Sequence, residues 1–567
     1  MTDNGTPARA RRRLKDRLPV RLRHHWKPAG ALCAGLAVIV YAFGDARVSP
    51  YVTSSSRTEA DVITENVEGT VDLYDASATH SIELAYEQTD FEKMMKEFRE
   101  DGTKDYIEAD LTIDGVYLND VGIRLKGNST LMSLRGNGRN MPGGGRDMPE
   151  GAGAGQGGPA PQQDGGTGGW GRGQDGGDPG TTGGNGDKGG AGGQGGAGRG
   201  GVGGPGGMGG MVQYNLSDKK PEELPWLIKI DEFVEGRAYQ GEREISLRPG
   251  SGDQMPLNEA LALNLMDGTG QKSERYSFTS VKVNNRPVST RLMVESPDTD
   301  YAESIEDGDG VLYKARAGGS FEYKGNDPTD YEKSFNQLNK VGSRDLEPVM
   351  ELVKWVNKAS DEEFERDLGK YVDIDSLATY VAAQNLMMNF DDMAGPGKNY
   401  LLWYDLDTKK FSVLGWDYNL TFSGDATAGP DDSMSMMPGG GAGMPEGMPE
   451  GMPEGMPTDL PEGMPAPEGG APGKDGGGAG PGGMGGHPLK ERFLESDAFD
   501  GVYKQAYREL YQKFYGSGAA LKALDRVADQ ARAAGADGAG LDTAADKLRG
   551  TVNDRTAALA KNKEVTG

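Results

Sequence analysis

The chain has 567 residues, of which 91 are Gly and one is Cys, and its 61 basic and 87 acidic residues give a formal net charge of −26. A single Cys excludes a disulfide framework and any zinc or iron–sulfur site built from several cysteines. Because such a polyanion repels phosphate backbones, we expect no nucleic-acid partner.

The N-terminal region has the pattern of a membrane anchor. A basic segment, residues 1–28, precedes the uncharged, mostly apolar residues 29–44 (AGALCAGLAVIVYAFG), a length near the lower limit of about 17 residues for a bilayer span. Basic residues before the span and acidic residues after it predict a single-pass protein of the cell membrane, with a cytoplasmic N-terminus and an extracellular remainder. The alternative is a signal peptide that is cleaved at Ala42-Phe43-Gly44, followed by secretion.

Two low-complexity tracts interrupt the rest of the chain. Residues 133–212 are nearly all Gly and polar residues, and residues 424–487 contain the repeat Gly-Met-Pro-Glu. Neither tract can bury enough apolar surface to offset its chain entropy, so both are predicted to be disordered insertions. After a linker at 45–67, the ordered parts are then expected at 68–132, 213–423 and 488–567.

Hydrophobic periodicity predicts strands in the first half of the ordered chain and helices in the second. The strands are expected at 81–86, 106–112, 115–126, 227–230, 243–247, 276–284 and 288–295, with a hairpin at 399–404 and 410–414. The helices are expected at 90–99, 256–267, 346–357, 361–368 and 373–389, and in the tail after 488. This order indicates an α+β fold with a β-rich lobe and an α-rich lobe.

Three segments contain polar and charged residues in patterns that are typical of a binding or catalytic site. Arg124 and Lys126 lead into a Gly-bearing turn whose amides suit an anion or phosphate, although an ordinary β-turn gives the same pattern. Asp391-Asp392 follows an apolar helix with Asn399 close behind, and Asp417 ends an apolar strand. Carboxylate and amide oxygens are the ligands that Mg²⁺ takes when it also binds phosphates, and a nearby acid can serve as general base. Each Asp taken alone is also compatible with a turn or a helix cap.

These segments carry a resemblance to a known family. GIRLKGNST, LIKIDE, NFDDMAGPGKNYLLWYD and VLGWDYNLTF resemble the CotH family of exported, atypical protein kinases, over most of the ordered chain from about residue 70. The resemblance implies an atypical protein-kinase-like, two-lobed fold that transfers the γ-phosphoryl group of ATP to Ser or Thr. The chain has neither the HRD nor the DFG triplet of ordinary kinases.

The resemblance also implies a role for each candidate residue. Asp391 would orient the acceptor hydroxyl as the catalytic acid, with Asp392 as the second choice. Asn399 and Asp417 would hold Mg²⁺ or Mn²⁺. Lys229 would contact the nucleotide phosphates and pair with Glu259. Arg124 and Lys126 would line the phosphate side of the site.

The expected function is therefore a metal-assisted Ser/Thr kinase that acts on extracytoplasmic or surface proteins. Two alternatives stay open. One is a non-catalytic cell-surface or assembly protein that keeps the kinase shape, and the other is nucleotidyl transfer from inverted ATP by the same fold.

Overall fold

The computed structural model describes residues 63–127, 129–135, 214–305, 309–432 and 486–566. The expected anchor at 29–44 and most of both Gly-rich tracts lie outside these residues.

Seven strands close into a barrel in the order β2-β3-β4-β5-β7-β9-β8. Neighbouring strands are antiparallel except β2 and β8, whose parallel pairing closes the barrel. Alternate residues point inward, as the two-residue period of a strand requires, and form an apolar core that helix α3 covers at one end. The elements of this part are β2 (His80–Tyr86), α3 (Gln88–Glu100), β3 (Ile107–Ile113), β4 (Val116–Leu125), β5 (Trp226–Lys229), β7 (Glu244–Leu247), β8 (Tyr276–Val283) and β9 (Ser289–Glu295).

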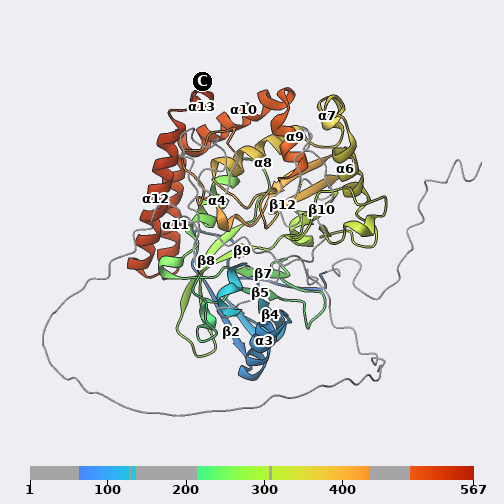
Figure 1. Cartoon of the computed structure of the whole chain (residues 1–567). Coiled ribbons are helices and arrows are strands. Elements are labelled where there is room, and N and C mark those ends of the chain that lie inside the picture. Colours follow the sequence, from blue (N-terminus) through green and yellow to red (C-terminus); the bar gives the residue numbers. More distant parts are fainter. Residues whose placement is uncertain (1–62, 128, 136–213, 306–308, 433–485, 567) are drawn as a thin grey trace, which may run out of the picture. The chain divides into compact units, whose positions relative to one another are not determined.

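A second, four-stranded antiparallel sheet of order β11-β10-β12-β13 follows the barrel along the chain. It shares one large apolar core with helix α4 and with the C-terminal helices, among which α10 packs along α8 and α11 along α12 (Figure 1). The strands of this sheet are β10 (Gly310–Ala315), β11 (Phe335–Gln337), β12 (Tyr400–Asp405) and β13 (Phe411–Gly415). The helices are α4 (Leu257–Asp267), α5 (Thr299–Glu303), α6 (Glu347–Lys358), α7 (Asp361–Asp367), α8 (Ile374–Leu386), α9 (Pro488–Glu495), α10 (Asp497–Tyr511), α11 (Ala519–Ala533), α12 (Gly538–Leu559) and α13 (Lys563–Thr566). A short parallel pair, β1 (Glu65–Val67) and β6 (Arg237–Tyr239), completes the strands of the described residues.

The structure confirms the mixed α+β class, and each expected strand and helix corresponds to an observed one within a few residues. Four strands were missed, β1, β6, β10 and β11, and β1 lies at the end of the expected linker 45–67. Five of the six residues of β10 are buried, so its sequence lacks the alternation of a half-exposed strand. Helix α8 ends at Leu386 rather than at 389, because Met388 takes a left-handed conformation with φ of 51°.

The expected boundary of the second insertion needs a correction. Residues 424–432 were assigned to the disordered tract, yet the structure places them against the helices. Asn385 donates from Nδ2 to the carbonyls of Gly429 and Asp432, and the Tyr503 hydroxyl donates to that of Pro430. Contacts from distant parts of the chain therefore order a segment whose own composition favours disorder.

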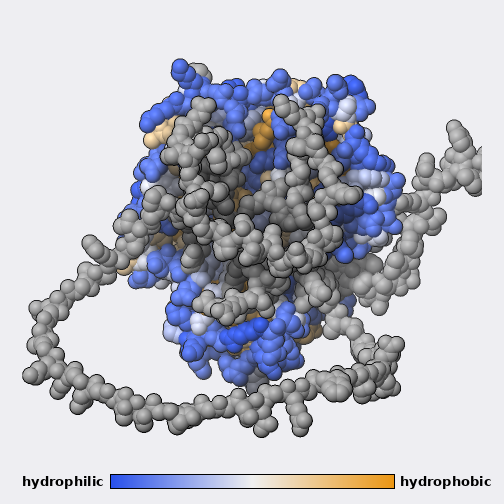
Figure 2. Space-filling model, in the orientation of Figure 1, coloured by the Kyte–Doolittle hydropathy of each residue, from blue (hydrophilic) through white to orange (hydrophobic). Residues whose placement is uncertain are grey.

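The surface of the described residues is mostly hydrophilic on the face that Figure 2 shows. Within the described ranges, no helix combines the length and the apolar character that a bilayer crossing needs.

Arg555 on α12 offers a test of this packing. Its side chain is fully buried and donates to the carbonyls of Asn385, Leu386 and Ala428. Arg555→Met should lower the free energy of unfolding by about 3 kcal/mol, because it removes several buried hydrogen bonds from a charged donor and leaves the carbonyl of Ala428 without the donor it has in the fold. Chemical denaturation measures the loss.

Arg549→Met is the matched control on the same helix, since Arg549 is half-exposed and, among the residues that the structure describes, pairs with the exposed side chains of Asp525 and Asp546. It should cost about 1 kcal/mol or less. Equal losses in the two variants would show that the buried contacts of Arg555 do not stabilise the fold.

Candidate functional site

The outward face of β4 and β5 carries basic side chains, and another basic residue directly follows β4. Alternate residues of these strands and of the neighbouring β7 belong to the barrel core, namely Ile123, Leu125, Trp226, Ile228, Ile245 and Leu247. Arg124, Lys126 and Lys229 occupy the intervening positions and therefore point outward. The guanidinium of Arg124 and the ammonium of Lys229 lie 5.1 Å and 5.7 Å from the ring centre of Tyr106, and Lys126 donates from Nζ to Ser296. The structure thus brings together three of the residues expected on the phosphate side.

Arg248, which directly follows β7, joins this face to the rest of the site. One of its terminal nitrogens lies 2.6 Å from Oε1 of Glu259 and 3.5 Å from Oδ1 of Asp417. Burial alone would lower the pKa of Arg248, but the carboxylates of Glu259, Asp417 and Glu274 outweigh burial and raise it. Arg248 is therefore a permanent cation held between two acidic side chains.

This arrangement corrects one expected contact. The resemblance implied that Glu259 pairs with Lys229, but Glu259 pairs with Arg248, and Lys229 pairs with Glu232 at 2.9 Å. Sequence reasoning missed Arg248 because it stands at the end of its strand without a distinctive motif. Its place as the last basic residue before the helix that carries Glu259 was the available signal.

Glu274 is a second residue that sequence reasoning missed. Its Oε1 accepts the backbone N–H of Asp417 at 3.1 Å, where the chain adopts a left-handed φ of 55°. Such a conformation is strained for a residue other than Gly and persists only where surrounding contacts hold it. Burial raises the pKa of Glu274 to about 7. Glu274 therefore fixes the backbone from which the Asp417 side chain extends.

The loop from Asn389 to Asn399 wraps around the carboxylate of Asp391. Gly397 donates its N–H to one oxygen of Asp391, and Asn399 donates from Nδ2 to the other at 3.2 Å. A Cβ on Gly397 would lie 2.4 Å from that carboxylate, so the close approach requires a glycine there. The Gly-Pro-Gly segment therefore helps to hold the carboxylate of Asp391 in place and is not only a turn.

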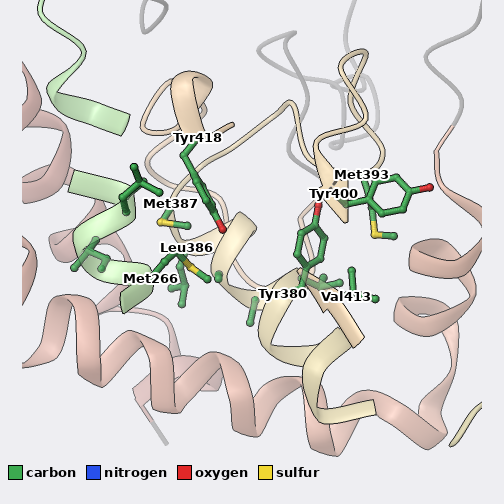
Figure 3. Close-up of a cluster of buried hydrophobic side chains, with 14 of the residues drawn as sticks. Met266, Tyr380, Leu386, Met387, Met393, Tyr400, Val413 and Tyr418 are labelled. Carbon is green, nitrogen blue, oxygen red and sulfur yellow. Dashed lines mark hydrogen bonds between the residues drawn. The ribbon is translucent and has the colours of Figure 1, made fainter. Parts of the chain in front are cut away.

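Buried side chains pack against this loop, and one of them, Tyr380, bonds to the loop through its hydroxyl. Figure 3 shows Tyr380, Tyr400 and Met393 in the buried cluster. The Tyr380 hydroxyl accepts the N–H of Met393 at 2.9 Å and donates to the carbonyl of Asn399 at 3.3 Å. The middle and the C-terminal end of the loop are therefore anchored to helix α8.

The two adjacent acids have different surroundings. Burial raises the pKa of Asp391 to about 6, the charges of Asp417 and Asp392 add to this, and the bonds from Gly397 and Asn399 oppose it. Asp392 forms an ion pair with Lys490 of α9 and accepts the N–H of Ala394 at 2.8 Å. Asp391 therefore has the environment of a general base near neutral pH, whereas Asp392 is engaged in holding α9.

Asn399 connects Asp391 with Asp417, two of the residues expected in the site. Its Nδ2 bonds to Asp391 and lies 3.5 Å from the carbonyl of Asp417. Buried Oε2 atoms of Glu259 and Glu274 and Oδ1 of Asn419 have no hydrogen-bond partner among the described residues, whereas Oδ1 of Asp417 faces Arg248. Such orphaned oxygens fit a hard cation.

No group of three or more His, Cys, Asp or Glu side chains within the described ranges is arranged to hold a metal ion. A cation at Asn399 and Asp417 would therefore need phosphate or water oxygens as its other ligands, which is how Mg²⁺ is bound beside nucleotides.

The raised pKa of Asp391 predicts a pH-dependent stability. The pKa is about 6 in the fold against an ordinary 3.8, so folding favours the protonated form and stability falls as pH rises from about 4 to 6. Asp391→Asn removes this loss. It should raise the free energy of unfolding by about 3 kcal/mol at pH 8 and change it little near pH 4, as measured by denaturation at several pH values.

Asp405→Asn is the control of opposite sign, because the pKa of Asp405 is lowered by its bonds to Thr408. This variant should lose rather than gain stability at pH 8. A gain from Asp391→Asn that is equal at pH 4 and pH 8 would contradict the buried, perturbed carboxyl.

The comparisons with known proteins agree with the resemblance read from the motifs. Inner spore coat protein H of Bacillus subtilis (strain 168) is 24% identical to this chain over 198 residues, which are 34% of this chain and 54% of that protein. The chain thus spans about half the length of this curated relative. The family model described as CotH kinase protein matches residues 214–515, which is more than half of the chain. This match includes Lys229, Arg248, Glu259 and the whole segment from Asp391 to Asp417, and the chain belongs to the CotH kinase protein family.

Proposed function

We propose that the protein transfers the γ-phosphoryl group of ATP to Ser or Thr hydroxyls of protein acceptors. The observation that carries the proposal is the Asn399 amide, which bonds to the buried Asp391 and approaches the backbone of Asp417. This arrangement joins a group with the pKa of a general base to candidate ligands of a divalent cation. Basic side chains on the outward barrel face supply charge for the phosphates.

The connectivity around Arg248 supports a kinase-like, two-lobed arrangement. In protein kinases a Lys on one strand pairs with a Glu on the helix that follows it. Here Arg248 directly follows β7 and pairs with Glu259 on α4, the next helix along the chain. The barrel would be the β-rich lobe, and the second sheet with its helices would be the α-rich lobe.

The proposed chemistry assigns each residue a task. The acceptor hydroxyl binds at Asp391, which takes its proton as the oxygen attacks the γ-phosphorus and the bond to the bridging β-phosphate oxygen breaks, releasing ADP. Arg124, Lys126 and Lys229 hold the phosphates, while Arg248 and Glu274 position Asp417. Bound at Asn399 and Asp417, Mg²⁺ or Mn²⁺ would neutralise charge on the phosphate oxygens.

The place of action is also a proposal. The relative's name assigns that protein to the inner spore coat, and the N-terminal pattern of this chain favours export. We propose that the acceptors are extracytoplasmic or surface proteins, reached from a membrane-anchored or secreted form.

Transfer of labelled phosphate tests the function. The full chain with Mg²⁺ or Mn²⁺ and a generic protein acceptor should incorporate label from γ-labelled ATP and none from α-labelled ATP. Asp391→Asn should lower kcat by about 10²- to 10⁴-fold because the general base is lost. In the unaltered chain kcat should rise with pH up to about 6, as Asp391 loses its proton.

Asp405→Asn, at the end of β12, should keep full activity. Incorporation from α-labelled ATP would instead support nucleotidyl transfer. Incorporation of neither label would support a surface or assembly role without catalysis.

A further inference from the structure

A small pocket beside the Asp391 loop gathers cationic and donor side chains that the proposed chemistry does not use. Its lining includes Arg316, Ser334, Lys398, Tyr400 and His487, and its cavity volume is about 10 Å³, which is room for roughly one water molecule. That is far below the roughly 300 Å³ at which pockets for small molecules begin. The pocket therefore has room for one oxygen atom of a small functional group and not for a nucleotide.

The donors in the pocket lack acidic partners. Arg316 donates one terminal nitrogen to Asn336 at 3.2 Å, while its buried Nε has no hydrogen-bond partner among the described residues. Lys398 is half-buried, and burial lowers its pKa. The nearest carboxylates are already engaged, since Asp392 is paired with Lys490, and Gly397 and Asn399 donate to Asp391.

His487 is an independent sign of a ligand. Its side chain is 1% exposed, and its Nδ1 has no partner among the described residues. Nε2 lies 3.0 Å from the Tyr400 hydroxyl. Burial, with the charges of Lys398 and Lys490, lowers the pKa of His487, so the ring is neutral. In the tautomer in which Tyr400 donates to Nε2, Nδ1 carries the proton and is an unused donor on a residue that lines the pocket.

The pocket thus has three hydrogen-bond donors without partners among the described residues, and two of them belong to cationic side chains. Such a set favours an anionic ligand. Carboxylate and phosphate both accept several charge-assisted hydrogen bonds, and Arg matches their planar or tetrahedral oxygens. Because Lys398 stands between Gly397 and Asn399, which both donate hydrogen bonds to Asp391, the pocket lies beside the position assigned to the acceptor hydroxyl. An anionic group bound here would belong to the acceptor and not to ATP, whose phosphates are assigned to the barrel face.

We propose that the pocket of Arg316, Lys398 and His487 binds an anionic side chain of the protein acceptor, close to the Ser or Thr that is phosphorylated. The anion is a carboxylate or a phosphate group. This inference rests on the proposed kinase function for its biological meaning, but the binding itself can be measured without catalysis.

The binding test uses the full chain with Asp391→Asn, so that turnover does not interfere. Three fluorescent peptides of equal length carry one Ser flanked on both sides by Ala, by Glu or by phosphoserine. The Glu or the phosphoserine peptide should bind about tenfold or more tightly than the Ala peptide, since one charge-assisted hydrogen bond is worth about 1.5 kcal/mol or more. A preference for phosphoserine alone identifies phosphate as the ligand, and equal gains identify the negative charge that both share.

Arg316→Met and Lys398→Met, each added to that protein, should remove the preference. Lys333→Met is the matched control, because Lys333 is an exposed lysine of the neighbouring segment that does not line the pocket, and it should keep the preference. Equal binding of all three peptides, or an unchanged preference in Arg316→Met, overturns the proposal.

Kinetics separate this inference from the proposed function. In the active chain, Arg316→Met should raise KM for the Glu peptide about tenfold and leave kcat, KM for ATP and KM for the Ala peptide unchanged. A rise in KM for ATP instead would assign the cations to the nucleotide and overturn the inference. Anion-selective peptide binding without any phosphoryl transfer would refute the kinase function and leave the pocket standing.

Discussion

The buried charge of Arg248 is the constraint on which the rest of the site depends. A guanidinium taken out of water must be neutralised nearby, because an uncompensated buried charge costs several kcal/mol. Glu259 at 2.6 Å and Asp417 at 3.5 Å meet this need, and they come from α4 and from the end of β13. The neutralisation of one side chain therefore ties the barrel, the following helix and the second sheet together at a single point.

The same region contains buried acidic side chains with raised pKa values and several residues with a left-handed backbone. Glu274 and Asp391 are buried with pKa values raised to about 7 and about 6, while the backbone turns left-handed at Met388, Lys398 and Asp417. Strain and unbalanced charge cost stability and persist where the surrounding packing imposes them. Here the packing is the apolar layer beneath the loop (Figure 3). A phosphate-bound cation would relieve this electrostatic cost, and this supports the proposal that these groups form a binding site.

Most strands and helices and the main polar residues of the candidate site could be predicted from local sequence patterns. The closure of the barrel and the partner of Glu259 could not. The two-residue and 3.6-residue periods located most strands and helices, and the motif around Asp391, Asn399 and Asp417 indicated which polar residues would meet. Pairing between β2 and β8 closes the barrel across nearly two hundred residues, and no local pattern encodes it. The partner of Glu259 was mistaken for a different reason, because Arg248 is the last basic residue before α4 but stands in no distinctive motif.

The central claim is that Asn399 and Asp417 hold a phosphate-bound cation opposite the basic face of the barrel. A crystal structure with Mn²⁺ and a non-hydrolysable ATP analogue tests it directly, since anomalous scattering locates the metal without reference to any assumed mechanism. The account predicts Mn²⁺ at about 2.0–2.2 Å from oxygens of Asn399 and Asp417, with the phosphates against Arg124, Lys126 and Lys229. Metal bound away from both residues, or phosphates bound away from the barrel face, would contradict it.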